Sequence, residues 1–151
     1  MLLQLLLLQN LYFLGIVHPC LYILFLLALP AELDRHWVIV IGFITGLIID
    51  LFSHSLGVHT AACTFICFLR PYLIDRLVQE DERLVDTINS VSLGWEAYIK
   101  YVSLMAVAHY TIVAFLEAFS FRHIGLTLLQ IVLSALLTIA LILGYELTRH
   151  D

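Results

Sequence analysis

The stretch from Gly42 to Thr60 constrains the fold of this chain more than any other part of the sequence. It reads GFITGLIIDLFSHSLGVHT, with an apolar first half that holds one carboxylate and a second apolar run after Ser-His-Ser-Leu-Gly. At about 100° per residue on a helix, the small and polar residues share one face; they are Gly42, Thr45, Gly46, Asp50 and Ser53. Glycine lets another helix approach closely, and polar groups in lipid need partners inside the bundle. The stretch therefore predicts two membrane helices in a tight hairpin, with an acidic group near the turn.

The composition extends this prediction to the whole chain. Of the 151 residues, 62% are hydrophobic and 13% are charged, whereas a soluble domain has about 45–50% apolar and about 25% charged residues. This length fits one helical membrane domain over residues 1–151. The net charge of −5 argues against nucleic acid as a partner and against a polybasic lipid-binding surface. The N-terminus lacks the positive segment of a cleavable signal peptide.

Apolar runs predict an all-α bundle of about six transmembrane helices; they cover Met1–Phe13, Cys20–Leu29, Trp37–Phe52, Val58–Leu69, Tyr98–Phe119 and Leu126–Tyr145. The first run is too short for a hydrocarbon core about 30 Å thick. Either its helix continues past Gly15 or the chain lacks an original N-terminal extension, and we favour the second explanation. Arg70 and Pro71 are expected to end the fourth helix. Residues 71–96 form the one long polar segment, which predicts an amphipathic helix at the cytoplasmic surface.

Thin polar seams run along the last two predicted helices and are expected to face the bundle interior. In the fifth helix the seam consists of Lys100, Ser103, Ala106, Tyr110, Ala114 and Glu117. In the sixth it consists of Gln130, Ser134, Thr138 and Tyr145.

Basic residues in short loops predict the orientation. Arg70, Arg76 and Arg83 lie around the polar segment, and Arg149 follows the last helix. Both regions are therefore expected in the cytoplasm, together with both chain termini, and the Ser53–Gly57 turn is expected outside.

Two groups of residues could bind a metal or transfer protons, and for both we favour a structural role. His59, Cys63 and Cys67 recur every four residues, but no fourth metal ligand shares the spacing, and cysteine is a common small filler. No metal or other cofactor is therefore expected. Asp50 near His54 resembles a proton relay, although a single carboxylate at a hairpin end more often fixes the turn. The protonation state of Asp50 stays open. No set of catalytic residues is present, so the sequence predicts a protein that is not an enzyme.

The segment Phe43–Ser53, followed by Leu56–His59, resembles the MreD family of bacterial rod-shape-determining membrane proteins. The family signature is a glycine, two or three apolar residues, Asp-Leu-Phe-Ser and a glycine-containing turn into the next helix. Shorter matches accompany it at Pro19–Ile23, Leu29-Pro30 and Phe68–Pro71. The resemblance covers residues 1 to 76, and beyond these only length and hydropathy agree. His54 and His59 occupy turn positions that vary in the family, which weakens any role for them.

The resemblance implies a non-catalytic, multi-pass protein of the bacterial inner membrane that belongs to the machinery of cell elongation and peptidoglycan synthesis. Its implied partners are the single-span periplasmic protein MreC and, through it, MreB, RodA and a transpeptidase. It also implies a fold similar to the substrate-binding (S) component of energy-coupling-factor transporters. The structural or partner-binding candidates on this chain are Gly42, Gly46, Asp50, Phe52, Ser53 and Gly57. The alternative is an S-component-like transporter subunit that binds a vitamin or another small ligand near the Ser53–His59 turn.

Overall fold

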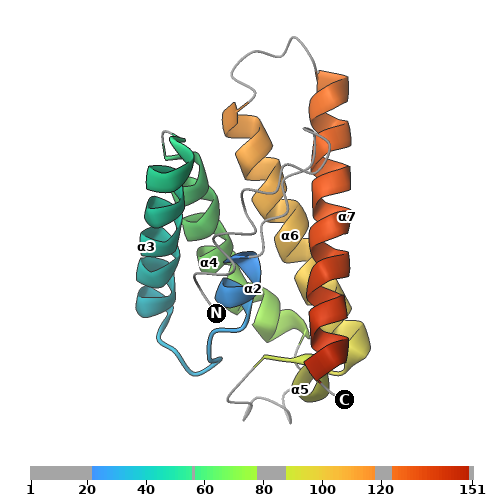
Figure 1. Ribbon diagram of the computed structural model, residues 1–151. Coiled ribbons are helices and arrows are strands. Elements are labelled where there is room, and N and C mark those ends of the chain that lie inside the picture. Colours follow the sequence, from blue (N-terminus) through green and yellow to red (C-terminus); the bar gives the residue numbers. More distant parts are fainter. Residues whose placement is uncertain (1–21, 56, 78–87, 118–123, 150–151) are drawn as a thin grey trace.

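The computed structural model describes residues 22–55, 57–77, 88–117 and 124–149, with side chains undescribed at residues 124–128, 130 and 149. All regular elements in these residues are helices (Figure 1). They are α2 (Tyr22–Leu27), α3 (Arg35–Ser53), α4 (Val58–Leu77), α5 (Ser90–Leu93), α6 (Trp95–Glu117) and α7 (Ile124–Arg149). The helical hairpin predicted for the Gly42–Thr60 stretch is confirmed, because α3 and α4 pack against each other and are joined by a short turn. Of its two helices, only α3 is among the described segments that are long and apolar enough to cross a membrane.

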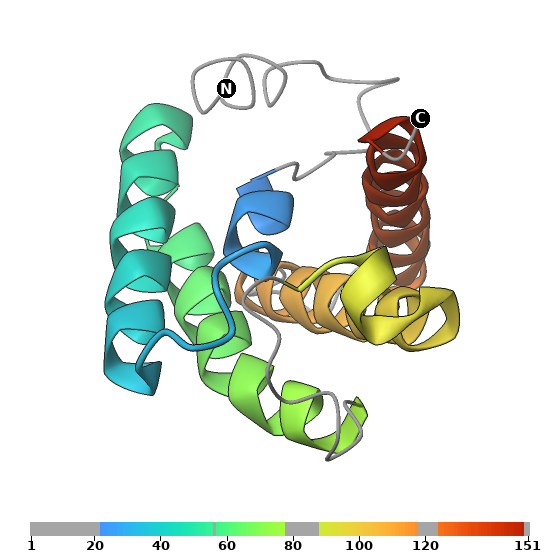
Figure 2. The same cartoon turned by 90° about the horizontal axis from the view of Figure 1, so that it is seen from below.

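The long helices follow one another around an arc. α3 packs on α4, α4 on α6 and α6 on α7, and α2 lies on the inner side of this arc (Figure 2). The buried core is centred on α2, α4 and α6, where Ile23, Ile66 and Tyr101 are all fully buried. The short helix α2 is therefore enclosed by the longer helices.

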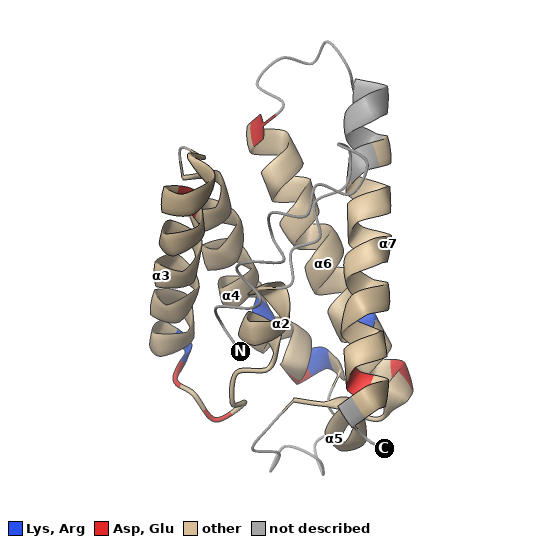
Figure 3. Ribbon diagram, in the orientation of Figure 1, with Lys and Arg blue, Asp and Glu red and all other residues tan. Residues whose placement is uncertain are grey.

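Among the described residues, three helical segments are long and apolar enough to cross a membrane: Arg35–Ser53, Trp95–Glu117 and Ile131–Thr148 within α7. The 19 residues of α3 span about 28 Å, close to the hydrocarbon thickness of about 30 Å. Large apolar side chains such as Leu51 and Phe115 are about 70% exposed, as expected of surfaces that meet lipid. Acidic and basic residues of the described part gather mostly towards helix ends (Figure 3). The architecture is that of an all-α membrane protein.

The second predicted span, Cys20–Leu29, is described only from Tyr22 onward. Its described part contains the six-residue α2, about 9 Å long, and six helical residues cannot cross a membrane by themselves. The first predicted span, Met1–Phe13, lies outside the described residues.

The predicted end of the fourth helix at Arg70-Pro71 is wrong. α4 continues through Pro71 to Leu77, although proline removes one hydrogen bond and costs about 3 kcal/mol inside a helix. The extension is stabilised by burial, because Leu73, Ile74 and Leu77 pack against the core. The polar segment 71–96 is therefore not one surface helix: its start belongs to α4, its end to α5 and α6, and residues 78–87 lie outside the described part.

The predicted seams are correct in their middle and wrong at their ends. Ala106, Tyr110, Ser134 and Thr138 are buried, and the hydroxyls of Tyr110 and Thr138 lie 2.7 Å apart across α6 and α7. The seam residues at the helix ends are exposed: Lys100, Glu117 and Tyr145. Side chains near the ends reach the membrane surface, so their polarity does not require an inward position.

Candidate functional site

The carboxylate of Asp50 joins α3 to the start of α4, and this is the best-defined polar site in the described part of the chain. Its Oδ1 accepts hydrogen bonds from Ser55 Oγ at 2.5 Å and from the backbone N–H of His59 at 3.0 Å. Its Oδ2 accepts from the N–H of Thr60 at 2.8 Å and from Thr60 Oγ1 at 2.5 Å. We call these four residues the Asp50 latch. Asp50 itself is only 6% exposed.

The latch has a simple cause in the geometry of helix ends. The first N–H groups of a helix have no acceptor within the helix, and they carry partial positive charge. α4 begins at Val58, so the N–H groups of His59 and Thr60 are of this kind. In lipid they have no water to bond. A carboxylate from the preceding helix satisfies both and caps α4 from outside.

Two glycines bring Asp50 close enough to reach these groups. A Cβ on Gly46 would lie 2.4 Å from Thr60 Cα and 2.7 Å from the carbonyl oxygen of His59. A Cβ on Gly42 would lie 2.5 Å from Cys67 Sγ. The backbones of α3 and α4 therefore touch at Gly46, and a side chain there would push the helices apart.

Two described residues of the turn between the helices have positive φ. His54 follows the last residue of α3 with φ of 53°, and Gly57 precedes α4 with φ of 84°. Glycine adopts positive φ without strain, which explains why the turn holds Gly57. The N–H of Gly57 donates to the carbonyl of Ser55 at 2.8 Å, and this bond orients Ser55 within the latch.

The candidate residues from the sequence divide into two groups. The inward group, which builds the hairpin, is Gly42, Gly46 and Asp50, whereas Gly57 is exposed in the turn. Phe52 and Ser53 point outward, and Phe52 is 75% exposed. The prediction that Ser53 shares the buried face is wrong, because the contact with α4 starts at the level of Asp50 and Ser53 lies beyond it.

A second polar group lies in the middle of the bundle. The hydroxyl of Tyr22 in α2 lies 2.8 Å from His59 Nδ1 and 2.8 Å from His109 Nε2. The two imidazole rings are stacked, with centroids 6.4 Å apart. We call Tyr22, His59 and His109 the tyrosine–histidine cluster; it ties α2 to α4 and α6.

The single proton of the Tyr22 hydroxyl determines the hydrogen bonds of this cluster. The hydroxyl donates to one imidazole, so the other imidazole must donate its own N–H to the Tyr22 oxygen. His109 is fully buried, and its Nδ1 has no hydrogen-bond partner among the described residues. A buried N–H without an acceptor is rarer than an unpaired acceptor. This favours His109 as the donor, through Nε2–H, and Tyr22 as the donor to His59.

Tyr22→Phe is expected to lower the free energy of unfolding by about 2 kcal/mol, because both imidazoles lose the hydroxyl they contact. Thermal unfolding in detergent micelles measures this. The control is Tyr145→Phe, since Tyr145 is 40% exposed; that variant should match the parent. Equal midpoints for all three proteins would show that the cluster contributes nothing to stability.

Arg70 is a buried cation that holds the end of α2. It is 2% exposed, and its guanidinium donates to the carbonyl oxygens of Leu29 and Pro30 and to the hydroxyl of Tyr101. Leu29 and Pro30 follow α2 in the chain, and buried backbone carbonyls need hydrogen-bond donors. Arg70 therefore ties the segment after α2 to α4.

Glu146 has the corresponding role at the other side of the bundle. It is 2% exposed, and its Oε1 accepts hydrogen bonds from the N–H of Ser90 at 2.9 Å and from Ser90 Oγ at 3.0 Å. Ser90 is the first residue of α5, so this carboxylate too accepts from an N–H at a helix start. Glu146 ties α7 to α5 as Asp50 ties α3 to α4.

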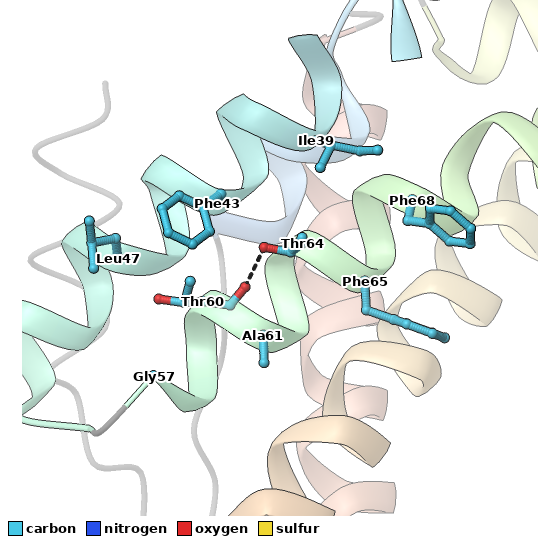
Figure 4. A pocket seen from close by; sticks show the side chains of 9 residues that line it. All are labelled: Ile39, Phe43, Leu47, Gly57, Thr60, Ala61, Thr64, Phe65 and Phe68. Atoms are coloured by element: carbon cyan, nitrogen blue, oxygen red, sulfur yellow. Dashed lines mark hydrogen bonds between the residues drawn. The ribbon is translucent and has the colours of Figure 1, made fainter. Parts of the chain in front are cut away.

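The outer face of the hairpin carries a shallow apolar groove of about 640 Å³. Figure 4 shows it between α3 and α4. Its lining is Ile39, Phe43, Leu47, Gly57, Thr60, Ala61, Thr64, Phe65 and Phe68. The Thr64 hydroxyl donates to the Thr60 carbonyl, 2.7 Å away in the same helix. The groove thus has little polarity to offer a ligand, and an apolar chain suits it best.

The predicted packing role of the histidine–cysteine series matches the positions of its members. Cys63 and Cys67 are buried thiols, and Cys67 packs against Gly42. His59 contacts Tyr22 in α2. Among the described residues there is no group of three or more residues of the metal-binding types.

Sequence reasoning missed His109 and Arg70. His109 had a usable signal, since an ionisable residue inside an apolar span is a candidate for an interior role. The sequence predicts for Arg70 only the end of a helix and a cytoplasmic position. Their partners in α2 and in the segment after it are far away in sequence, and no local pattern links them.

Comparison of the chain with protein-family models, with curated proteins and with solved structures finds no match in any of the three. The class of protein therefore follows from the fold and the site alone. This chain is an all-α membrane protein whose buried polar groups join one helix to another.

Proposed function

We propose that this protein is a non-catalytic, multi-pass component of the bacterial cell-elongation machinery, similar to MreD, with both termini in the cytoplasm. It binds an MreC-like single-span partner and supports the link between MreB and the wall-synthesis enzymes, RodA and its transpeptidase. The proposal includes a bundle of about six spans similar to the S components of energy-coupling-factor transporters. It starts from the resemblance of the Phe43–His59 region to that family.

The observation that carries the proposal is the division of the motif into an inner and an outer part. Gly42, Gly46 and Asp50 lie inside the hairpin, and the Asp50 carboxylate accepts three hydrogen bonds from the start of α4 and one from Ser55 in the turn. Phe52 and Ser53 are exposed at the end of α3. An exposed aromatic residue on a rigid helix end is well suited to anchor a partner helix. A structural interior with an exposed anchor supports a scaffold protein.

The other buried charges support the same conclusion. Arg70 binds backbone carbonyls of the Leu29–Pro30 segment, and Glu146 binds Ser90. Each of these groups holds two helices together, which is a structural use of charge inside a membrane.

Phe52→Ala is expected to reduce co-purification of a single-span partner from membranes of a rod-shaped host by about tenfold, the loss of one hot-spot aromatic. Because Phe52 is exposed, the unfolding midpoint should not change. Phe115→Ala on α6 is the matched control, since Phe115 is 71% exposed. Removing the whole protein from the host should abolish rod shape. Equal recovery of the partner with both variants would refute the Phe52 contact, and unchanged cell shape after removal would refute the proposed function.

A transport role is the second candidate. The tyrosine–histidine cluster favours it, because it places polar groups between α2, α4 and α6 in the middle of the bundle. Loss of vitamin uptake with unchanged cell shape would favour this role over the scaffold.

A further inference from the structure

Arg35 lies where the apolar groove of the α3–α4 hairpin opens towards the start of α3. Its guanidinium carbon lies 4.5 Å from the ring centre of Phe68 and 4.7 Å from that of Tyr72. Its Nη2 donates to the Tyr72 hydroxyl at 2.8 Å. Phe68 belongs both to this contact and to the lining of the groove, so the cation and the groove form one continuous surface.

The residues below Arg35 continue the surface along one side of α3. Ile39, Phe43 and Leu47 line the groove, and with Arg35 they recur every four residues along one side of the helix. From Arg35 to Leu47 the helix rises about 18 Å. One leaflet contributes about 15 Å of the hydrocarbon core. The surface therefore has a cation at one end and an apolar track about one leaflet long.

The charge of Arg35 is available to an anion. A guanidinium has five N–H donors, and among the described residues only Tyr72 accepts from Arg35. Glu32 and Asp34 precede it in the chain, yet no ion pair joins either of them to Arg35 in the described structure. Contact with aromatic faces holds the guanidinium in place, and its planar fork binds phosphate oxygens in pairs.

We propose that this surface binds one anionic phospholipid, with the phosphate on Arg35 and an acyl chain along the groove. Charge complementarity selects this occupant: the groove offers one cation at the membrane surface and only apolar contacts below it, and such a lipid has one phosphate above an apolar chain. The site lies on the groove side of α3, on a different face of the helix from Phe52. The proposal does not depend on the proposed function, because it concerns the purified chain.

The test measures lipid retained by the purified full chain in mixed micelles, using phosphatidylglycerol and phosphatidylcholine with identical acyl chains. Arg35→Gln is expected to reduce retention of phosphatidylglycerol by about tenfold, the loss of one charge-assisted contact, and to leave phosphatidylcholine unchanged. The matched control is Lys100→Gln, which removes the same charge from an exposed ion pair with Glu96. It should change neither lipid.

Ala61→Phe fills the groove without changing charge, because Ala61 is an exposed residue of its lining. It should reduce retention of both lipids. If Arg35→Gln fails to fold, this variant still tests whether a lipid occupies the groove. Equal losses of phosphatidylglycerol in Arg35→Gln and Lys100→Gln would overturn the proposal, since they would reflect net charge alone. Unchanged lipid retention in Ala61→Phe, with loss of a co-purifying protein, would assign the groove to a partner helix and also overturn it.

Discussion

Asp50→Leu is expected to separate the start of α4 from α3 and to cause the largest loss of stability of any single substitution in the hairpin. The variant removes the acceptor of four hydrogen bonds, and two of the donors are backbone N–H groups that lipid cannot satisfy. Each unpaired buried donor costs about 1–3 kcal/mol. We expect a loss of about 4 kcal/mol or more, which corresponds to little folded protein in membranes.

Asp50→Asn is expected to give an intermediate result. Its carbonyl oxygen can replace one carboxylate oxygen and accept two of the four hydrogen bonds. The amide NH₂ then faces one hydroxyl, which can accept, and one backbone N–H that is left without an acceptor, since an asparagine side chain has one accepting oxygen where the carboxylate has two. The expected order of stability is parent, then Asn, then Leu.

Protein level, unfolding midpoint and complementation of cell shape should be compared for both variants. Asp34 is the control position, because it is exposed and makes no capping hydrogen bond with its side chain; Asp34→Asn should change stability by less than about 0.5 kcal/mol. If Asp50→Asn abolishes function at a normal protein level and an unchanged midpoint, Asp50 has a proton or cation role and the latch is not its main purpose.

Gly46→Ala is expected to destabilise the protein even though alanine favours helices. The added Cβ would meet the backbone of α4, 2.4 Å from Thr60 Cα and 2.8 Å from Thr60 N. Backbone atoms in a helix cannot move aside as a side chain can, so the helices must separate. Overpacking of this kind costs about 1–3 kcal/mol, and we expect about 2 kcal/mol because the same displacement pulls Thr60 from Asp50.

Gly144→Ala in α7 is the matched control. An added Cβ there has no atom within 4 Å, so only the helix propensity of alanine acts, and it should raise stability by up to about 1 kcal/mol. Gly42→Ala should lie between the two, because its nearest contact is the side-chain sulfur of Cys67. Unfolding midpoints of the three variants give the comparison. A Gly46→Ala protein as stable as Gly144→Ala would mean that α3 and α4 are not in backbone contact at this point.

The sequence by itself determined the membrane class, the hairpin and the inward position of Asp50. These follow from local rules, since apolar length determines whether a helix can cross a membrane, and a glycine–glycine–carboxylate stripe permits only one close-packed face. The hairpin partners are also near in sequence, so the turn brings Asp50 to the first N–H groups of α4 without any knowledge of the remaining chain.

Other predictions of inward faces and helix ends are wrong, because a helix in lipid is apolar on several sides. Periodicity then cannot decide which side faces inward, so it predicts Lys100 and Glu117 in a seam although both are exposed. The predicted end of α4 is wrong for a related reason. The local cost of Pro71 is visible in the sequence, whereas the burial of Leu73 and Ile74 that offsets it depends on the rest of the fold.

Only the tertiary structure decided the use of the remaining buried polar groups. Tyr22 meets His109 across 87 residues, and Arg70 meets Leu29 across 41. Such pairs form because a buried polar group must find a partner wherever the packing of helices places one. The sequence shows that these groups need partners, but the choice of partner depends on how α2 is enclosed by α4 and α6, and that arrangement exists only in the folded bundle.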